Sequence, residues 1–191
     1  RADPEKHRLQ TPSGRIEIFS QRIEGFGYED CPPHPAWLPP KEWLGADAAQ
    51  RFPLHLVSNQ PSDRLHAQMD AGPLSQANKI AGREKLRVNP RDAEARGLAG
   101  GDVARIHNER GACLAGVEID AGVLPGVIVM ATGAWYDPSG ADAQHLERHG
   151  NPNVLSFDLG TSKLAQGPSA LSVLVEVEKW AGPLPPVCAH E

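Results

Sequence analysis

The sequence predicts a mainly β protein with short helices, organised as a closed β-barrel. Short runs of apolar residues alternate with polar ones along the chain, which is typical of half-buried strands. The 191 residues include 19 Gly and 18 Pro, and Pro exceeds its average share of about 5%. Frequent Gly and Pro indicate many turns between short elements. About six or seven short strands with few helices fit a small closed barrel.

Six segments carry the strand pattern. They are residues 14–20, 54–58, 103–108, 112–119, 127–130 and 171–178. Alternation in the last segment places Leu171, Val173, Val175 and Val177 on one face. Residues 109–111 separate two of the strands and are expected to form a hairpin loop.

Two segments are expected to form short helices. Asn89 can cap a helix that begins at Pro90, and Asp92 complements the positive end of its dipole. Gly97 favours the end of this helix. Residues 141–148 form the second predicted helix.

The chain is expected to contain one barrel with two additions. Residues 1–50 are predicted to form an N-terminal strand and a Pro-rich arm packed on the barrel, because proline fixes φ and blocks regular strand pairing. Residues 51–183 are predicted to form the barrel, and residues 184–191 a C-terminal tail. The sequence begins at Arg1 rather than Met, so we expect it to be part of a longer protein.

Composition argues against several classes of function. The net charge of −5 disfavours a nucleic-acid partner, which would call for a basic surface. No apolar run of the sequence approaches the roughly 18 residues of a membrane span. Cys31, Cys113 and Cys188 are widely spaced, so reduced thiols are favoured over a zinc or iron–sulfur site.

The sequence contains no motif of a self-contained catalyst. It lacks H-E-x-x-H, a G-x-S-x-G turn, a Walker loop and G-x-G-x-x-G. His145 and His149 are four residues apart on the second predicted helix and could bind a metal, although a solvated helix face is the more common use of such a pair. We therefore assign no catalytic and no metal-binding residue from the sequence.

Two polar segments near the end of the chain indicate a binding loop. Residues 150–155 and 160–167 are dense in Gly, Asn, Ser, Thr and Gln, yet they include Val154, Leu155 and Leu164. A solvated linker does not need such apolar anchors. A loop that holds a polar ligand against a packed body needs both kinds of residue.

Another candidate is the segment 58–68, which follows a predicted strand and therefore occupies a common position for binding loops. It offers a cation, an imidazole and an amide from Arg64, His66 and Gln68. If the segment is extended, all three side chains point to one side. The alternative is a polar surface loop.

For three further groups of residues, spacing alone favours a structural role over a binding role. Asn89 and Asp92 stand at a helix N-terminus, where a carboxylate could accept the paired donors of a guanine edge, but helix capping is the simpler use. Asn108 could contact a ligand, but a turn role is favoured. Trp135 and Tyr136 could stack on a flat ring, but core packing is the more common role.

Together these segments resemble the C-terminal domain of the molybdenum-dependent S- and N-oxide reductases. This branch of the molybdopterin oxidoreductases includes the dimethyl sulfoxide, trimethylamine N-oxide and biotin sulfoxide reductases. Each matching stretch is short, but the ordered set covers most of the chain. The matching stretches are residues 11–20, 63–68, 88–97, 101–103, 108–111, 133–138, 149–155, 160–167 and 175–179.

The resemblance implies a double-psi β-barrel that caps a bis(molybdopterin guanine dinucleotide) molybdenum cofactor. The implied pterin and phosphate contacts are Arg64, His66 and Gln68. The implied guanine contacts are Asn89 and Asp92. The residues implied to complete the pocket are Asn108, Asn153, Lys163 and Gln166. Gln60 occupies a position where relatives often have His. A polar contact is kept, but Gln cannot gain a charge by protonation as an imidazole can.

The resemblance also implies a function for the parent enzyme. Its cofactor performs two-electron oxygen-atom transfer from an S-oxide or N-oxide, with biotin sulfoxide among the candidate substrates, and preceding domains supply the metal ligand. The 191-residue piece is expected to bind the dinucleotide, to be inactive alone and not to retain the cofactor when isolated. The parent is expected in the cytoplasm, with the periplasm as the alternative.

Two other functions remain open at this point. One is a cofactor-free β-barrel interaction module, in which Gln68, Asp92 and Asn153 would be scattered over the surface rather than gathered on one concave face. The other is the equivalent domain of a formate dehydrogenase or a nitrate reductase.

Overall fold

The computed structural model describes residues 3, 5–140, 146–169 and 172–191. The described helices are α1 (Gln21–Glu24), α2 (Pro73–Asn78), α3 (Pro90–Glu94) and the 3-10 helices η1 (Asp47–Gln50) and η2 (Pro152–Leu155). The described strands are β1 (Leu54–Asn59), β2 (Lys85–Val88), β3 (Val103–His107), β4 (Ala112–Ile119), β5 (Val127–Ala131), β6 (Leu146–Glu147) and β7 (Val173–Lys179). Among the described residues, none of the helices has the length and apolar character needed to cross a membrane.

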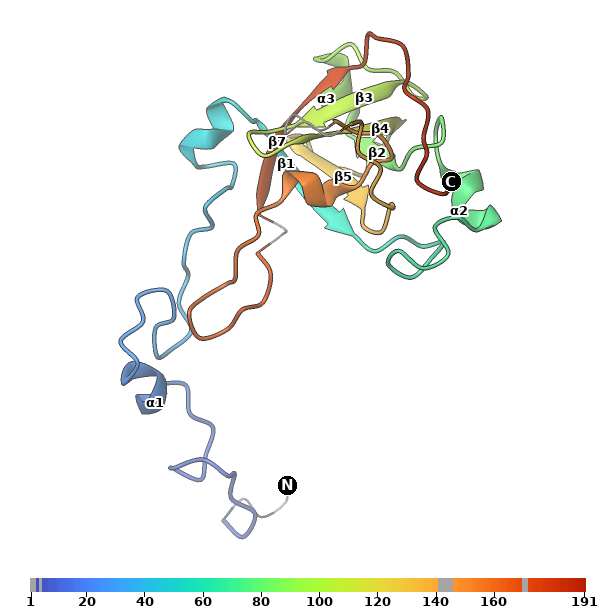
Figure 1. Cartoon of the computed structure of the whole chain (residues 1–191). Helices are drawn as coiled ribbons and strands as arrows, with labels where there is room; N and C mark the ends of the chain where they lie inside the picture. The colour runs from blue at the N-terminus through green and yellow to red at the C-terminus, as the bar shows by residue number, and fades with distance from the viewer. Residues whose placement is uncertain (1–2, 4, 141–145, 170–171) are drawn as a thin grey trace. The chain divides into compact units, whose positions relative to one another are not determined.

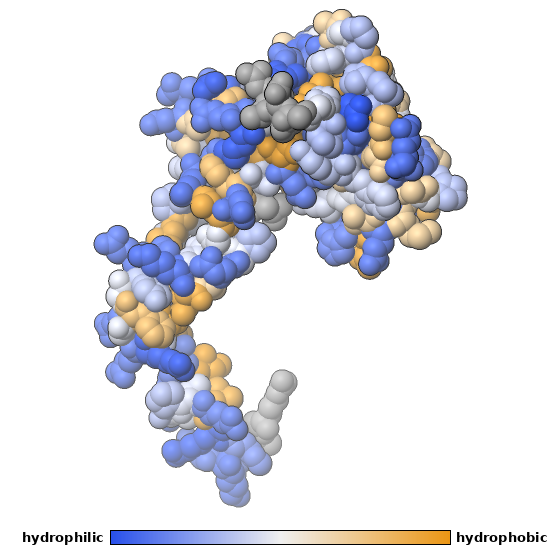
Figure 2. Space-filling view, viewed as in Figure 1, coloured by the Kyte–Doolittle hydropathy of each residue, from blue (hydrophilic) through white to orange (hydrophobic). Residues whose placement is uncertain are grey.

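The chain divides into two compact units. The first comprises Arg1–Pro39 and Leu159–Pro168, and the second comprises Pro40–Asp158 and Ser169–Glu191. All seven strands belong to the second unit. On the visible face of each unit, apolar residues are scattered among hydrophilic ones (Figure 2). The predicted domain boundaries at residues 50 and 183 stay a prediction.

The strands close into a barrel. Their order in the sheet is β2-β5-β1-β7-β3-β4-β6, and an additional pairing of β2 with β4 closes six of them into a ring (Figure 1). The pairs β1–β5 and β2–β4 are parallel. The other four pairs of the ring are antiparallel. The fold class expected from the sequence, a mainly β double-psi barrel with short helices, is confirmed.

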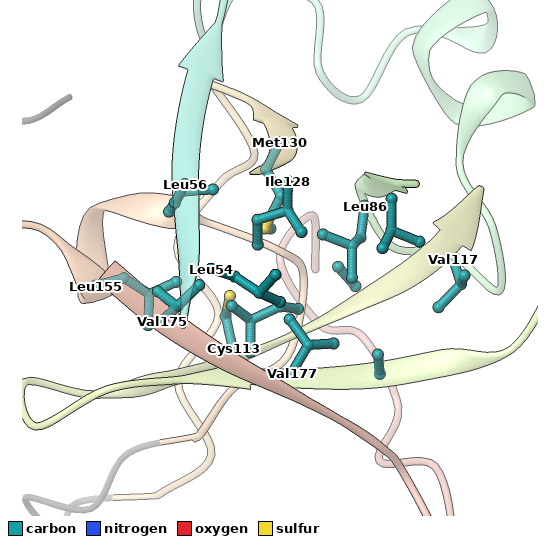
Figure 3. Close-up of a cluster of buried hydrophobic side chains, with 14 of the residues drawn as sticks. Leu54, Leu56, Leu86, Cys113, Val117, Ile128, Met130, Leu155, Val175 and Val177 are labelled. Carbon is teal, nitrogen blue, oxygen red and sulfur yellow. The ribbon is translucent and has the colours of Figure 1, made fainter. Parts of the chain in front are cut away.

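The core fills the barrel with side chains from every one of its strands (Figure 3). Burial alternates along β2 and β5, as expected for strands with one face inside. In β4, by contrast, residues 112–117 are all buried. Ile80 covers the strand at Gly116, so closely that a Cβ on Gly116 would collide with it. Just before the strand, Gly111 also lies close to the Val154 carbonyl.

Most of the predicted elements form where the sequence placed them. The strands predicted at 54–58, 103–108, 112–119, 127–130 and 171–178 correspond to β1, β3, β4, β5 and β7. Asn89 caps α3, since its side chain accepts a hydrogen bond from the Arg91 N–H. β2 was missed because its four residues, Lys85–Val88, are too few to show alternation.

One predicted element was wrong, and the described end of another differs from its prediction. Residues 14–20 form turns and bends instead of a half-buried strand, and Ile16 and Ile18 are 83% and 75% exposed. The Gly14 N–H bonds locally to the Thr11 carbonyl, and a strand needs a partner along its length. The helix predicted at 141–148 falls partly outside the described residues, since 141–145 are not described, and Leu146–Glu147 form a short strand.

Candidate functional site

One end of the barrel gathers most of the polar segments singled out above. The strand registers bring together the C-terminal ends of β1 and β5 and the N-terminal end of β2: Asn59 pairs with Ala131, and Leu86 with Met130. The N-terminal end of β4 lies at the same end, because β2 and β4 are parallel. We call this region the loop end. It is formed by residues 59–72, 84, 108–111, 132–138 and 147–155.

Close backbone contacts join the loops 59–72 and 132–138. Gly133 has φ of +95°, and a Cβ there would lie 1.9 Å from the His66 carbonyl oxygen. Only glycine allows this approach. Trp135 reinforces it, since its indole N–H donates to the Ala67 carbonyl at 2.8 Å and its backbone N–H donates to Asp70 at 3.2 Å.

The segment 147–155 is held by a buried carboxylate. Glu147 is fully buried, and its oxygens accept from the backbone N–H groups of residues 137, 149, 150 and 151. Burial raises the pKa of Glu147, and these backbone donors offset part of that rise. Gly150 lies close to Glu84, the residue that precedes β2. The carbonyl of His149 accepts a hydrogen bond from the Glu84 N–H, and a Cβ on Gly150 would lie 2.7 Å from the Glu84 Cβ.

Asn108 ties the β3–β4 hairpin to the same region. Its side-chain N–H groups donate to the Leu155 and Leu174 carbonyls, and its side-chain oxygen accepts from the Arg110 N–H. The favoured turn role is therefore confirmed. The amide also fixes the end of η2, which carries Asn153.

A buried ion cluster lies under the 59–72 loop. The Arg64 guanidinium contacts Asp63, Asp70 and Glu84, and Lys79 contacts Asp70 and Glu84. The side chains of Arg64 and Lys79 are each 1% exposed. Desolvation raises the pKa of Asp70, but Lys79 and the backbone N–H of Trp135 outweigh it, so this pKa lies below its ordinary value. Two buried cations thus face three carboxylates, an excess of one negative charge.

Four of the ten predicted site residues are exposed at the loop end. They are Gln60, His66, Gln68 and Asn153. Gln60 Nε2 lies 3.0 Å from His66 Nδ1. His66 and Met69 adopt left-handed backbone angles, with φ of 50° and 64°, which is uncommon for residues with a Cβ and often marks a functional loop.

Asn89 and Asp92 lie at the opposite end of the barrel. β2 runs from the loop end at Lys85 to Val88, and α3 follows directly. Both side chains serve the backbone there: Asn89 donates to the Val123 carbonyl, and Asp92 accepts from the Gly126 N–H. The structure does not bring these two residues together with Gln68 and Asn153.

Lys163 and Gln166 belong to the first unit and are described there. The Lys163 backbone N–H donates to Asp30, and its ammonium lies 5.9 Å from the centre of the Tyr28 ring. Gln166 donates to the Ser162 carbonyl at 2.6 Å. Their predicted part in the pocket stays a prediction.

A cavity of about 310 Å³ opens beside the loop end, along the outer sides of β2 and β5. None of the ten predicted residues lines it. Its charged lining is largely paired, since Lys85 lies 2.7 Å from Glu118, and Arg87 contacts Asp120. The arginine lowers the pKa of Asp120. Because these charges already have partners, the loop end is the better candidate for the site.

Unpartnered polar atoms also mark the loop end. Among the described residues, the buried side-chain atoms Ser58 Oγ and Thr132 Oγ1 have no hydrogen-bond partner, and Arg64 Nε has only its ion-pair contact with Asp70 Oδ1 at 3.4 Å. Ser58 and Thr132 stand at the adjoining ends of β1 and β5, and Arg64 donates to the Thr132 carbonyl. Leaving such groups unpaired costs about 1–3 kcal/mol each, so the region fits a ligand rich in hydrogen-bonding groups.

Sequence reasoning missed the acidic partners of this region. Asp63, Asp70, Glu84 and Glu147 were not singled out, because their basic and backbone partners are distant along the chain. It also expected core packing for Tyr136, which is 54% exposed. The sequence feature that could have pointed to these acidic residues is the high density of charged residues between positions 63 and 87.

The fold and the loop end define a β-barrel domain that presents hydrogen-bonding loops at one end for a polar ligand. The family described as "Molydopterin dinucleotide binding domain" matches residues 54–174, and the chain belongs to this family. The resemblance found from the sequence is confirmed.

Similar proteins support this assignment. The chain is 48% identical over 183 residues to a dimethyl sulfoxide/trimethylamine N-oxide reductase of Cereibacter sphaeroides, covering 95% of this chain and 22% of that protein. It is 47% identical over 182 residues to a biotin sulfoxide reductase of the same organism, covering 95% and 24%. It is 46% identical over 192 residues to a trimethylamine-N-oxide reductase of Salmonella typhimurium, covering 99% and 23%.

A solved structure shows the same fold. Acetylene hydratase from Pelobacter acetylenicus matches 93% of this chain and 25% of its own with a TM-score of 0.72 and 20% identity. The chain spans about a quarter or less of the length of the curated relatives described above.

Proposed function

We propose that this chain binds the dinucleotide part of a molybdopterin guanine dinucleotide cofactor at the loop end of its barrel. The observation that carries the proposal is the convergence of four separated loops, with unpartnered buried polar atoms, in a chain of the molybdopterin dinucleotide-binding family. A pterin and a guanine both present several donors and acceptors, which such loops can pair.

Exposed side chains of the loop end would make the direct contacts. Gln60, His66, Gln68 and Asn153 offer amides and an imidazole without large apolar neighbours covering them. Asn108 would act indirectly, because its amide is already used to position η2. Arg64 would reach a phosphate only by exchanging one of its carboxylate partners.

A second location for the guanine is kept as an alternative. Asp92 has one oxygen bound to the Gly126 N–H, while its other oxygen lies 3.9 Å from Arg96. Asn89 and Asp92 would hold the base at the far end of the barrel, and the cofactor contacts expected of Lys163 and Gln166 stay a prediction. The loop end is favoured because Asn89 and Asp92 already satisfy backbone groups.

In a parent enzyme the chain would work with other domains. The bound cofactor would supply two-electron transfer of an oxygen atom from an S-oxide or N-oxide, in line with the names of the relatives. This chain's residues would bind and orient the cofactor, and we expect the 191-residue piece alone to be inactive and to lose the cofactor on isolation. Preceding domains and the oxide substrate would be its partners.

Matched amide variants of the full-length parent test the proposal. Gln68→Ala and Asn153→Ala should each lower the molybdenum and guanine-nucleotide content at limiting cofactor by about fivefold or more, since a lost hydrogen bond of about 1 kcal/mol or more weakens binding by that factor. Gln50→Ala, an exposed glutamine outside the loop end, is the control and should keep full content.

The same measurement separates the alternatives. If Asp92→Ala loses molybdenum and guanine-nucleotide content and the loop-end variants do not, the guanine site is assigned to the far end of the barrel. Full content in all variants, with an unchanged unfolding midpoint, would contradict both locations.

A further inference from the structure

A second cluster of potential ligand atoms lies beside the ion cluster, and the proposed cofactor function does not use it. Asp70, His149 and His190 each offer one atom within 4.8 Å of those of the other two. The side chains of Asp70 and His149 are fully buried, and that of His190 is 24% exposed. The three residues are separated by 79 and 41 positions, so no sequence motif reveals them.

The two oxygens of Asp70 divide their partners. Oδ1 lies near the cations and a hydroxyl, at 2.9 Å from Lys79 Nζ, 3.4 Å from Arg64 Nε and 3.3 Å from Ser75 Oγ. Oδ2 faces the two histidines, at 3.4 Å from His190 Nε2 and 3.8 Å from His149 Nδ1. The positive charges are therefore on the far side of the carboxylate from the imidazoles.

Hydrogen bonding sets His190 Nε2 as an acceptor. Gln76 Nε2 donates to the Asp70 backbone carbonyl at 2.8 Å, which orients the amide, and the same nitrogen lies 3.2 Å from His190 Nε2. An amide nitrogen only donates, so the ring nitrogen presents its lone pair. His190 Nε2 also lies 3.4 Å from Asp70 Oδ2, which accepts from the Trp135 backbone N–H at 3.2 Å, so a metal here would take this lone pair in place of the Gln76 hydrogen bond.

His149 is prepared in the way metal ligands usually are. Its Nδ1 lies 3.0 Å from the Trp135 carbonyl, to which it donates, and its Nε2 is buried with no hydrogen-bond partner among the described residues. A ligating histidine typically donates its other N–H to a carbonyl or carboxylate.

We propose that Asp70, His149 and His190 form a site for a divalent first-row transition metal, with Zn²⁺ as the best fit. Two imidazoles and one carboxylate are a common zinc ligand set, and water would fill the fourth position on the half-exposed side. The nearby excess of carboxylates, three against two cations, favours an added positive ion.

Such a metal would fasten the end of the chain, which lies near α2 in Figure 1, to the 59–72 loop through Asp70 and to the 147–155 segment through His149. The segment that carries His190 is already held at two points, where the Cys188 N–H donates to Asp137 and Arg83 donates to the Pro185 carbonyl. The site would thus be structural, independent of whether a molybdopterin binds at the loop end.

Zinc titration of the chelator-treated 191-residue chain tests this proposal. We expect one Zn²⁺ per chain in isothermal titration with a dissociation constant of about 1 µM or lower, together with a raised unfolding midpoint. Co²⁺ should give the visible absorption of a four-coordinate nitrogen and oxygen site, without a thiolate band.

Three variants assign the ligands. His190→Ala should weaken Zn²⁺ binding at least 100-fold while leaving the unfolding midpoint in chelator unchanged. Cys188→Ser, which removes the neighbouring thiol, and His7→Ala, which removes an exposed histidine of the first unit, should bind as the unmodified chain does. Absence of one-to-one binding, equal affinity in His190→Ala, or loss of binding in Cys188→Ser would each overturn the proposal.

Discussion

Arg110 and Glu42 form a bidentate ion pair that joins the β3–β4 hairpin to the segment before β1. Their atoms pair at 2.7 Å and 2.9 Å, and Glu42 also accepts from the Leu174 N–H at 2.7 Å. The Arg110 guanidinium donates to the Leu155 carbonyl and lies 3.9 Å from the centre of the Phe157 ring. One carboxylate therefore connects three parts of the second unit.

Glu42→Gln is expected to destabilise the chain by about 2–3 kcal/mol, because it leaves a partly buried guanidinium short of one charged partner. Chemical unfolding measures the loss. Glu109→Gln breaks an ion pair with Arg51 whose side chains are 65% and 70% exposed, and this control should change the unfolding free energy by no more than about 0.5 kcal/mol. Equal effects of the two variants would show that the Glu42 pair has no special role.

Gly133→Ala should disrupt the loop end. The added methyl would collide with the His66 carbonyl at 1.9 Å in a backbone of positive φ, so we expect a loss of about 3 kcal/mol or more in the free energy of unfolding. Gly97→Ala is the matched control, since its φ is +62° but nothing lies within 4 Å. In Gly97→Ala only the cost of holding a residue with a Cβ at positive φ should remain, about 1–2 kcal/mol. Similar losses in both variants would argue against the close approach.

Glu147→Gln should destabilise the segment 147–155. An amide nitrogen replaces one of two oxygens that each accept from two backbone N–H groups, so two buried donors lose their acceptor at a cost of about 2–4 kcal/mol. Amide hydrogen exchange of Gly150 and Asn151 should accelerate as well. Glu118→Gln, at a half-exposed pair with Lys85, should leave this exchange unchanged, and unaltered exchange in Glu147→Gln would contradict the assignment.

His107 should make stability depend on pH. Burial lowers the pKa of His107 below its ordinary 6.5, Arg105 and Arg51 lower it further, and Glu178 and Glu176 oppose them. A folded-state pKa below the unfolded value means that the contribution is complete above 6.5 and is lost as the pH falls through the folded value.

The free energy of unfolding should therefore fall as the pH drops below about 6.5, with a slope of at most about 1.4 kcal/mol per pH unit from this group. His107→Gln removes the titrating ring and should show a shallower fall over that range. Superimposable profiles for the two proteins would exclude His107 as a source of the dependence.

Local patterns predicted the barrel because its strands are long enough to alternate. Val173, Val175 and Val177 face the core as their spacing indicates, and Asn89 caps α3 as its residue type favours. The same rules failed at Ile16 and Ile18, because alternation describes a strand's faces and says nothing about whether a partner strand exists.

The candidate site was less accessible to sequence reasoning. Gln68 was singled out by its position in a loop after a strand, and Asn153 lies in a polar segment that was singled out by composition, but only resemblance to a family assigned them to a cofactor. Glu147 and the pair of Arg64 with Glu84 depend on contacts between loops of the closed barrel, and no local pattern encodes such distances. The separation of Asp92 from Gln68 follows from the direction of β2, a strand that the sequence did not reveal.

The position of β7 between β1 and β3 has a consequence during synthesis. Until residues 173–179 leave the ribosome, the nascent chain presents two unpaired strand edges, and such edges invite pairing with other chains. Closure also requires contacts between residues more than a hundred positions apart, such as Leu54 with Val175, which slows folding. The nascent polypeptide should thus depend on chaperones until its final strand has been made.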